Sequence, residues 1–210
     1  MTARLVLATH NRHKVVELRA ILAPVMPGLA PSDVVGAGDV GAPEPHEDGV
    51  TFAENALIKA RALAAFTGLP AVADDSGLCV DVLGGAPGIF SARWAGRHGD
   101  DAANLALLLA QLADVRAEHR GAEFRCAAAL VTPGGFEHVE VGTLRGRLAT
   151  AGRGAGGFGY DPVLVPDRLP ARAAGAELTC AELTAEEKNA ISHRGEAFRA
   201  LAPTIARMLG

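Results

Sequence analysis

Hydrophobic positions in the first half of the chain follow two alternating periods, one typical of buried strands and the other of amphipathic helices. Short apolar runs predict strands at residues 4–8, 34–35, 71–73 and 78–83. Apolar residues at helical spacing predict helices at residues 15–22, 51–67 and 102–112. Because strands alternate with helices, the pattern favours an α/β fold.

The second half of the chain adds a strand pair and a long terminal helix. Residues 124–131 and 139–144 predict a β-hairpin that turns at Pro133-Gly134-Gly135. A further strand is expected at residues 162–165, and a helix over residues 193–209 closes the pattern. A hairpin inserted among alternating strands and helices indicates a mixed sheet with flanking helices.

Two helix starts are marked by capping boxes, in which a threonine side chain and a glutamate three residues later satisfy each other's backbone amides. Thr51 and Glu54 form one box, with Val50 as a candidate hydrophobic staple, and Gly68 is the expected stop of that helix. Residues 184–187 repeat the capping pattern, ahead of the helix that closes the chain.

The first candidate site is a polar segment between the first strand and the first helix. Backbone amides and the positive end of a helix dipole at this place favour an anion. Ordinary helix capping by Thr9 or Asn11, with a solvated basic helix end, is the alternative. The segment lacks the glycine spacing of a Walker A loop. Its members are Thr9, His10, Asn11, Arg12, His13 and Lys14.

The second candidate lies on the helix that begins after Thr51. Asn55 and Lys59 are four residues apart, so they share one helix face and could reach phosphates. From spacing alone, a solvated polar stripe is the favoured interpretation. Three acidic residues precede this helix and are either metal ligands or an acidic approach to the helix N-terminus, namely Glu44, Glu47 and Asp48.

The third candidate is Asp74-Asp75-Ser76-Gly77, which we expect in a loop at the end of an apolar strand. Two adjacent carboxylates are costly there unless a cation or hydrogen-bond donors meet at least one of them. Mg²⁺ suits such oxygen ligands, and a carboxylate can also deprotonate a water. An Asp-Ser-Gly turn without chemistry is the alternative. The Asp-x-Asp pattern of haloacid-dehalogenase phosphatases does not match.

The fourth candidate combines a glycine-rich aromatic segment with a basic one. Glycines around an aromatic side chain let a flat ring approach the backbone and stack. A plain glycine-rich turn is the alternative. The segments are Phe158, Gly159, Tyr160 and Asp161, and then Lys188, His193 and Arg194. Together the four candidates offer cations for phosphates, carboxylates for Mg²⁺ and an aromatic ring with donors for a base, as a nucleoside triphosphate requires.

Lysine usage sharpens this picture. Lysine and arginine together number 20, yet lysine occurs only at Lys14, Lys59 and Lys188. A coding bias that replaces surface lysine by arginine explains the majority. The three remaining lysines all fall inside candidate sites, where a compact ammonium differs from a planar guanidinium in binding phosphate.

Length and charge exclude several classes of protein. With 210 residues, 49% of them hydrophobic, and a net charge of −4, the chain is expected to form one packed domain without a nucleic-acid partner. No apolar run is long enough to cross a membrane, and no signal peptide is recognised, so a cytoplasmic location is expected. Three dispersed cysteines, at Cys79, Cys126 and Cys180, fit buried small hydrophobic residues better than a metal site.

Six motifs in order along the chain resemble the inosine triphosphate pyrophosphatase family, in particular its bacterial, actinobacterial branch. The resemblance extends from residue 4 to about residue 209. The motifs are Ala-Thr-His-Asn-Arg-His-Lys (8–14), Thr-Phe-Ala-Glu-Asn-Ala-Leu-Ile-Lys-Ala (51–60), Ala-Asp-Asp-Ser-Gly-Leu (73–78), Gly-Gly-Ala-Pro-Gly-Ile-Phe-Ser-Ala-Arg-Trp (84–94), Gly-Gly-Phe-Gly-Tyr-Asp-Pro (156–162) and Glu-Lys-Asn-Ala-Ile-Ser-His-Arg-Gly (187–195).

The resemblance implies one two-lobed α/β domain over residues 1–210, with a substrate cleft between the lobes, and a homodimer. It implies Mg²⁺-dependent hydrolysis of ITP, dITP and XTP to the monophosphate and pyrophosphate, which cleanses the nucleotide pool. Alternatives are a pyrophosphatase for another modified nucleotide and a nucleotide-binding sensor that does not hydrolyse.

The same resemblance implies roles for single residues. Asp75 would activate water and bind Mg²⁺, with Asp74 and Lys59 in the catalytic set. Residues 9–14 and Asn55 would line the phosphate end and Ser76 would touch substrate. The aromatic segment 158–161 would form the wall of the base pocket, and Lys188, His193 and Arg194 would meet the substrate, the last two near the 6-oxo group.

One stretch departs from the family pattern. Many bacterial members carry two successive acidic residues before the helix motif, whereas this chain has His46 followed by Glu47. Glu47 is therefore the expected second metal ligand, and Glu44 is the alternative.

Overall fold

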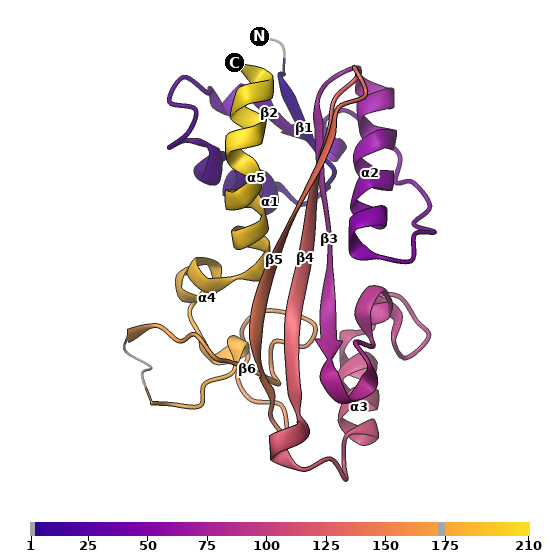
Figure 1. Ribbon diagram of the computed structural model, residues 1–210, viewed down its shortest axis with the longest axis vertical. Helices are drawn as coiled ribbons and strands as arrows, with labels where there is room; N and C mark the ends of the chain where they lie inside the picture. The colour runs from indigo at the N-terminus through magenta and orange to yellow at the C-terminus, as the bar shows by residue number, and fades with distance from the viewer. Residues whose placement is uncertain (1–2, 172–174) are drawn as a thin grey trace. The chain divides into compact units, whose positions relative to one another are not determined.

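Alternating strands and helices build a mixed six-stranded sheet in the computed structural model, which describes residues 3–171 and 175–210 (Figure 1). Part of the alanine-rich stretch 171–176 thus lies outside the described residues. The regular elements are β1 (Leu5–Leu7), α1 (Arg12–Leu22), β2 (Val34–Gly36), α2 (Phe52–Thr67), β3 (Ala71–Val80), α3 (Asp101–Gln111), β4 (Gly121–Val131), β5 (Glu137–Leu148), β6 (Leu164–Pro166), α4 (Ala185–Ile191) and α5 (His193–Leu209).

The sheet has the strand order β2-β1-β3-β4-β5-β6. β1 pairs in parallel with both β2 and β3, whereas β5 pairs antiparallel with β6. The parallel pairs come from strands joined by helices, and β4 and β5 are joined by the short hairpin turn that the sequence predicts. The predicted α/β class with a mixed sheet is confirmed.

Contacts divide the chain into two compact units, each with a hydrophobic core of its own. The first unit comprises Met1–Asp75, Cys126–Gly142 and Arg194–Gly210. The second unit comprises Ser76–Arg125 and Thr143–His193.

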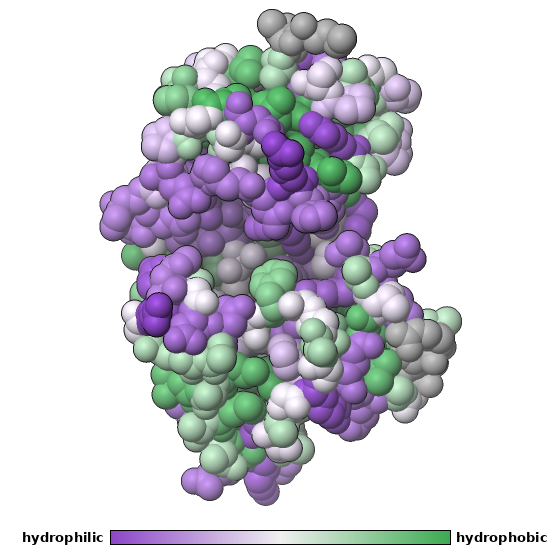
Figure 2. All heavy atoms as spheres, turned by 180° about the vertical axis from the view of Figure 1, so that it is seen from behind, coloured by the Kyte–Doolittle hydropathy of each residue, from purple (hydrophilic) through white to green (hydrophobic). Residues whose placement is uncertain are grey.

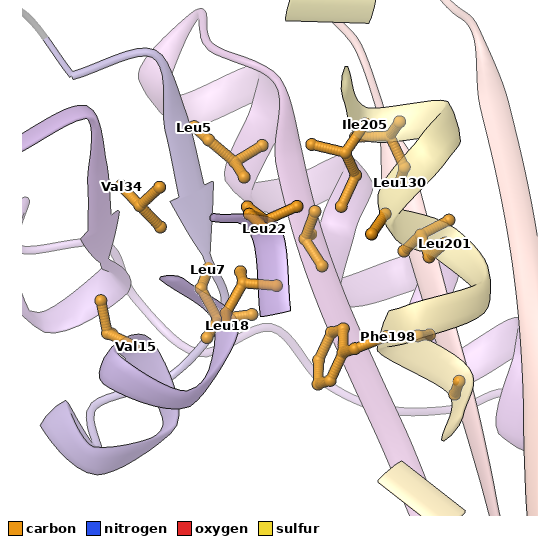
Figure 3. Close-up of a cluster of buried hydrophobic side chains, with 14 of the residues drawn as sticks. Leu5, Leu7, Val15, Leu18, Leu22, Val34, Leu130, Phe198, Leu201 and Ile205 are labelled. Atoms are coloured by element: carbon orange, nitrogen blue, oxygen red, sulfur yellow. The ribbon is translucent and has the colours of Figure 1, made fainter. Parts of the chain in front are cut away.

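The core of the first unit lies between the strands and two helices, α1 and α5. Figure 3 shows Leu5 and Leu7 of β1 facing Leu18 of α1 and, across the cluster, Phe198 of α5. Leu18 and Phe198 sit on helix faces that repeat every three to four residues, so each helix presents an apolar stripe to the strands. α2 lies on the other side of these strands (Figure 1).

The second unit has a core between α3, the neighbouring strands and the loop before β6. Leu108 and Leu112 at the end of α3 pack with Leu78 of β3 and Leu144 of β5, and all four are almost fully buried. Tyr160 belongs to the same cluster. The aromatic segment that the sequence singles out is therefore anchored in a packed core.

The predicted helix ends are largely confirmed. Thr51 accepts a hydrogen bond from the Glu54 amide, Glu54 accepts from the Thr51 amide, and Gly68 ends α2 with φ +67°, a left-handed conformation that favours glycine. Asn11, rather than Thr9, caps α1. The prediction of Val50 as a hydrophobic staple is wrong, because this residue is 77% exposed.

One prediction about strands is wrong. Residues 71–73 and 78–83 were expected as two strands separated by an Asp-Ser-Gly loop, but β3 runs without interruption from Ala71 to Val80. Gly77 permits this, because a Cβ there would come within 2.5 Å of the Gly88 carbonyl oxygen and 2.4 Å of Ser91 Oγ. Packing against this neighbouring segment overrides the turn preference of Asp, Ser and Gly.

None of the helices in the described part of the chain has the length and apolar composition that are needed to cross a bilayer. Hydrophobic residues reach the face drawn in Figure 2 in patches separated by hydrophilic ones. All three cysteines are free thiols; Cys126 and Cys180 are buried and Cys79 is half-buried, as predicted.

We expect Leu18→Ala to lower the free energy of unfolding by about 3 kcal/mol, because it removes a fully buried side chain between α1 and the strands. Val16→Ala on the same helix is the matched control. Val16 is mostly exposed, so its truncation should change stability by less than about 0.5 kcal/mol. Denaturant unfolding followed by circular dichroism measures both; equal losses would contradict this assignment of the core.

Candidate functional site

A lysine between two carboxylates lies at the centre of the polar site in the first unit. Lys59 Nζ lies 3.2 Å from Glu47 Oε1 and 3.5 Å from Asp75 Oδ1. Asn55, one turn earlier on α2, donates from Nδ2 to Asp75 Oδ2 at 3.0 Å and accepts from the Gly49 amide at 2.9 Å. We call Glu47, Asn55, Lys59 and Asp75 the Lys59 cluster.

Burial decides between the two interpretations of the α2 stripe. Asn55 is 2% exposed and the Lys59 side chain is mostly buried, so the solvated polar stripe favoured by the spacing is wrong. Burial raises the pKa of Asp75, while Lys59 and the Asn55 amide act in the opposite direction and favour its ionised form. The cluster therefore holds a carboxylate with several partners but little access to bulk water.

The Lys59 cluster fits the binding of Mg²⁺ in its donor chemistry. Carboxylate oxygens of Glu47 and Asp75 already surround one cationic group, and Mg²⁺ commonly takes one or two carboxylates with phosphates and water as its other ligands. Within the described part of the chain, no group of three or more His, Cys, Asp or Glu side chains is placed to hold a metal ion by itself. The donor set suits a metal that substrate phosphates help to hold.

Asp74 points away from Asp75 and has a different partner. Its carboxylate accepts from Arg194 Nη2 at 2.7 Å, and both side chains are buried or nearly so. The Arg194 guanidinium also lies over the Phe198 ring, 5.3 Å from its centroid. Burial lowers the pKa of Lys14, and the nearby Asp74 charge opposes this effect. Asp74 thus sits in a buried basic environment with Arg194 and Lys14.

The segment before α1 forms a hollow in the first unit. Thr9 Oγ1 accepts from the Asn11 amide at 3.1 Å, and Asn11 Oδ1 accepts from the His13 amide at 2.9 Å. His10 Nδ1 lies 3.1 Å from Glu44 Oε1, and the Glu44 side chain is 81% exposed. A cavity of about 200 Å³ adjoins this segment, lined by Thr9, His10, Asn11, Arg12, Val15, Gly36, Gly38 and Asp39.

Glu44 and Glu47 are the two alternatives for the second metal ligand, and they have different partners in the structure. Glu47 belongs to the Lys59 cluster with Asp75, whereas Glu44 is paired with His10. The geometry favours Glu47 as the partner of Asp75.

A second pocket, of about 140 Å³, lies in the second unit and contains the aromatic segment. Its walls come from β3, β4, α4, the first residues of α3 and α5, the 3₁₀ helix Gly88–Arg93 and the loop before β6. Its lining residues are Ser76, Gly77, Leu78, Ser91, Ala92, Asp101, Phe124, Phe158, Gly159, Tyr160, Asp161, Lys188 and His193. Phe124 and His193 stack with ring centroids 5.1 Å apart. We call this cavity the aromatic pocket.

Hydrogen bonds and a cation–π contact fix the loop that carries the aromatic residues. Asp161 accepts from the Phe158 amide at 2.8 Å and forms an ion pair with Lys188, whose Nζ lies 4.7 Å from the Phe158 ring centroid. Tyr160 donates from its hydroxyl to the Ser91 carbonyl oxygen at 2.9 Å. Burial, with the Asp101 charge as a second cause, raises the pKa of Tyr160, so its hydroxyl stays a neutral donor.

The structure therefore brings the candidate residues together in two groups. Thr9 to Lys14, Asn55, Lys59, Asp74, Asp75 and Arg194 lie in the first unit, and Ser76, Phe158 to Asp161, Lys188 and His193 lie in the second. Sequence reasoning missed Asp101 and Ser91, which line the aromatic pocket. Asp101 directly precedes the helix predicted at residues 102–112, and Ser91 belongs to the motif 84–94, but neither signal indicates a pocket.

Comparisons with known proteins agree with these motifs. The model of the Ham1 family matches residues 5–204. A relative from Streptomyces coelicolor named dITP/XTP pyrophosphatase is 66% identical over 208 residues and 99% of each chain is covered.

Two solved structures are similar as well. A nucleoside-triphosphatase / dITP/XTP pyrophosphatase from Mycobacterium abscessus is 49% identical, with a TM-score of 0.75 over 95% of this chain and 99% of that one. A HAM1 protein from Coxiella burnetii is 37% identical, with a TM-score of 0.84 over 98% and 100% of the two chains. The resemblance found in the sequence motifs is confirmed, and the chain belongs to the Ham1 family.

Proposed function

We propose that this protein hydrolyses non-canonical purine nucleoside triphosphates, namely ITP, dITP and XTP, to the nucleoside monophosphate and pyrophosphate. The observation that carries the proposal is the Lys59 cluster, in which a buried ammonium and two carboxylates meet beside an amide. Membership of a family whose relatives are named dITP/XTP pyrophosphatases supports the choice of substrate.

The hydrolytic step is assigned to Asp75. Its carboxylate accepts a proton from a water molecule as the water oxygen bonds to the α-phosphorus, and the bond from this phosphorus to the bridging oxygen breaks. Pyrophosphate leaves with that oxygen and the nucleoside monophosphate remains. Asn55 and Lys59 hold the carboxylate in one orientation through their contacts at 3.0 and 3.5 Å. Such fixed orientation lowers the barrier because the reacting groups need no rearrangement.

Lysines, together with Mg²⁺ when it is bound, would neutralise the negative charge of the phosphates. Lys14 and Lys59 lie in the first unit and would stabilise the negative charge that develops as water attacks. Asp75 and Glu47 would hold Mg²⁺, which when bound would neutralise phosphate charge and orient the leaving group. Family membership is the basis for proposing Mg²⁺, a cytoplasmic location and a homodimer.

The aromatic pocket is the proposed site of the base. Phe158 offers a flat ring, and His193, with Arg194 next to it in the chain, would supply the donors from which a 6-oxo group accepts, while Lys188 would also meet the substrate. A 6-amino group would leave such a donor unpaired, which disfavours adenine.

Family membership is also the basis for proposing one two-lobed domain over residues 1–210, in which the triphosphate meets residues of the first unit and the base meets residues of the second.

The function is tested by measuring pyrophosphate release with Mg²⁺ from ITP, XTP, dITP, ATP and GTP. We expect ITP, dITP and XTP to be cleaved with kcat/KM at least about 100-fold above that for ATP, because the base is discriminated by hydrogen-bond polarity. Release from none of the five nucleotides would favour a sensor or another modified nucleotide as substrate. Equal turnover of ATP and ITP would remove the proposed specificity.

Asp75→Asn should reduce kcat for ITP by about 10³-fold, because an amide cannot accept the proton from water. The variant keeps the shape of the side chain and should retain the wild-type circular dichroism spectrum. Asp114→Asn, at an exposed carboxylate of the second unit, is the control and should leave kcat unchanged. A near-normal kcat in Asp75→Asn would show that another group activates the water.

Lys14→Arg and Lys59→Arg should each lower kcat/KM for ITP by about tenfold or more although they keep the charge. Lys59 Nζ lies 3.2 Å from Glu47 and 3.5 Å from Asp75, and a guanidinium, whose donors lie in a fixed planar fork, would present its charge to these carboxylates in a different geometry. Arg116→Lys at an exposed position is the reverse exchange and should have no effect. Wild-type kinetics in both lysine variants would refute the argument from lysine scarcity.

A further inference from the structure

The loop that carries Phe158 has a composition that leaves it flexible unless other residues hold it. Phe158 is flanked in sequence by Gly156, Gly157 and Gly159, and it is 75% exposed. Gly157 and Gly159 adopt φ values of +73° and +59°, which few other residues accept. An exposed ring on such a loop can serve as a binding surface only if its backbone is fixed from outside.

Two carboxylates from different parts of the second unit hold the backbone at this ring. Asp161 Oδ2 accepts from the Phe158 amide at 2.8 Å. Asp101 Oδ2 accepts from the next amide, that of Gly159, at 2.9 Å. The first bond is made within the loop itself, whereas the second connects the loop to the first residue of α3. Of these two bonds, the one to Asp101 ties the backbone at Phe158 to α3, and it adds to the anchoring of the loop by Tyr160 and by the Asp161–Lys188 ion pair.

Helix α3 is a firm support for this bond. Asp100 caps the helix by accepting from the Ala103 amide at 3.1 Å, and Leu108 and Leu112 at its other end are fully buried. Asp101 also lines the aromatic pocket with Phe158 and Gly159. Helix α3 thus fixes the Asp101 carboxylate at the pocket wall, where it accepts a hydrogen bond from the amide of Gly159, the residue next to Phe158.

We propose that Asp101 is a positioning residue that fixes the Phe158 ring for binding of the base; this rests on the proposed function of the aromatic pocket. The hydrogen bond from the Gly159 amide keeps the loop in its binding geometry before the ligand arrives. Without it, the loop must be ordered at the moment of binding, and that entropy cost weakens binding. The reacting phosphate end is unaffected, so the effect falls on binding and not on the chemical step.

The kinetic test compares Asp101→Ala with Asp101→Asn. We expect Asp101→Ala to raise KM for ITP about fivefold while kcat stays within about twofold of the wild type. Asp101→Asn keeps an oxygen that accepts from the Gly159 amide and should restore most of the wild-type KM. A wild-type KM in Asp101→Ala, or an Asn variant as impaired as the Ala variant, would overturn the proposal.

Asp100→Ala is the matched control, since Asp100 is the neighbouring carboxylate at the same helix end. This variant removes the cap of α3 and should lower stability by about the amount typical of a lost cap, with KM unchanged. An equal rise of KM in Asp100→Ala would show that Asp101 acts only through the stability of α3, and would also overturn the proposal.

Hydrogen–deuterium exchange provides a readout that needs no substrate. In Asp101→Ala, amides of the loop 156–161 should exchange faster than in the wild type, and in Asp101→Asn they should not. Unchanged loop exchange in Asp101→Ala would overturn the positioning role even if the enzyme is active. Faster loop exchange in a protein that hydrolyses none of the nucleotides would retain Asp101 as the support of the loop and refute the proposed function alone.

Discussion

The uninterrupted strand β3 is the constraint on which the polar site of the first unit depends. Side chains of adjacent residues in a strand point to opposite faces, so Asp74 and Asp75 cannot share one environment. Each buried carboxylate therefore needs a cation of its own, since an unpaired buried charge is strongly unfavourable. Arg194 meets Asp74, and Lys59 meets Asp75.

This arrangement explains why two helices remote in sequence are recruited around one strand. α2 supplies Lys59 to one carboxylate, and α5 supplies Arg194 at its first turn to the other. The two helices lie on opposite sides of the strands (Figure 1), as the alternation of side chains demands. Asp74 is thus the partner of Arg194, which fits a role in holding that guanidinium better than a role in activating water.

Local signals in the sequence were sufficient for the helices but not for the strand that carries the carboxylates. The capping box at Thr51 and the stop at Gly68 depend on neighbouring residues alone, and both are confirmed. Residues 74–77 have the composition of a turn, and only contacts with the distant Gly88 and Ser91 reveal why they stay extended. In the same way, the spacing of Asn55 and Lys59 shows a shared face, but the burial of that face depends on β3 and the loop before α2.

Composition and the motifs together predict part of the candidate site. The scarcity of lysine indicated Lys14, Lys59 and Lys188, and the structure places all three beside carboxylates or in buried surroundings. The sequence does not predict the role of Asp101, because its partner is a backbone amide 58 positions away. Residue type and spacing carry no information about such a contact.

The division into two units has a consequence for the history of this protein. The chain passes from one unit to the other four times, after residues 75, 125, 142 and 193, so neither unit corresponds to a continuous stretch of gene. A single recombination event can therefore neither duplicate nor exchange one of them, and ribosomal synthesis completes the first unit only with the last helix. Two of the four crossings fall inside the motifs at residues 73–78 and 187–195. The shortest continuous stretch of gene that encodes the first unit intact therefore spans the whole chain.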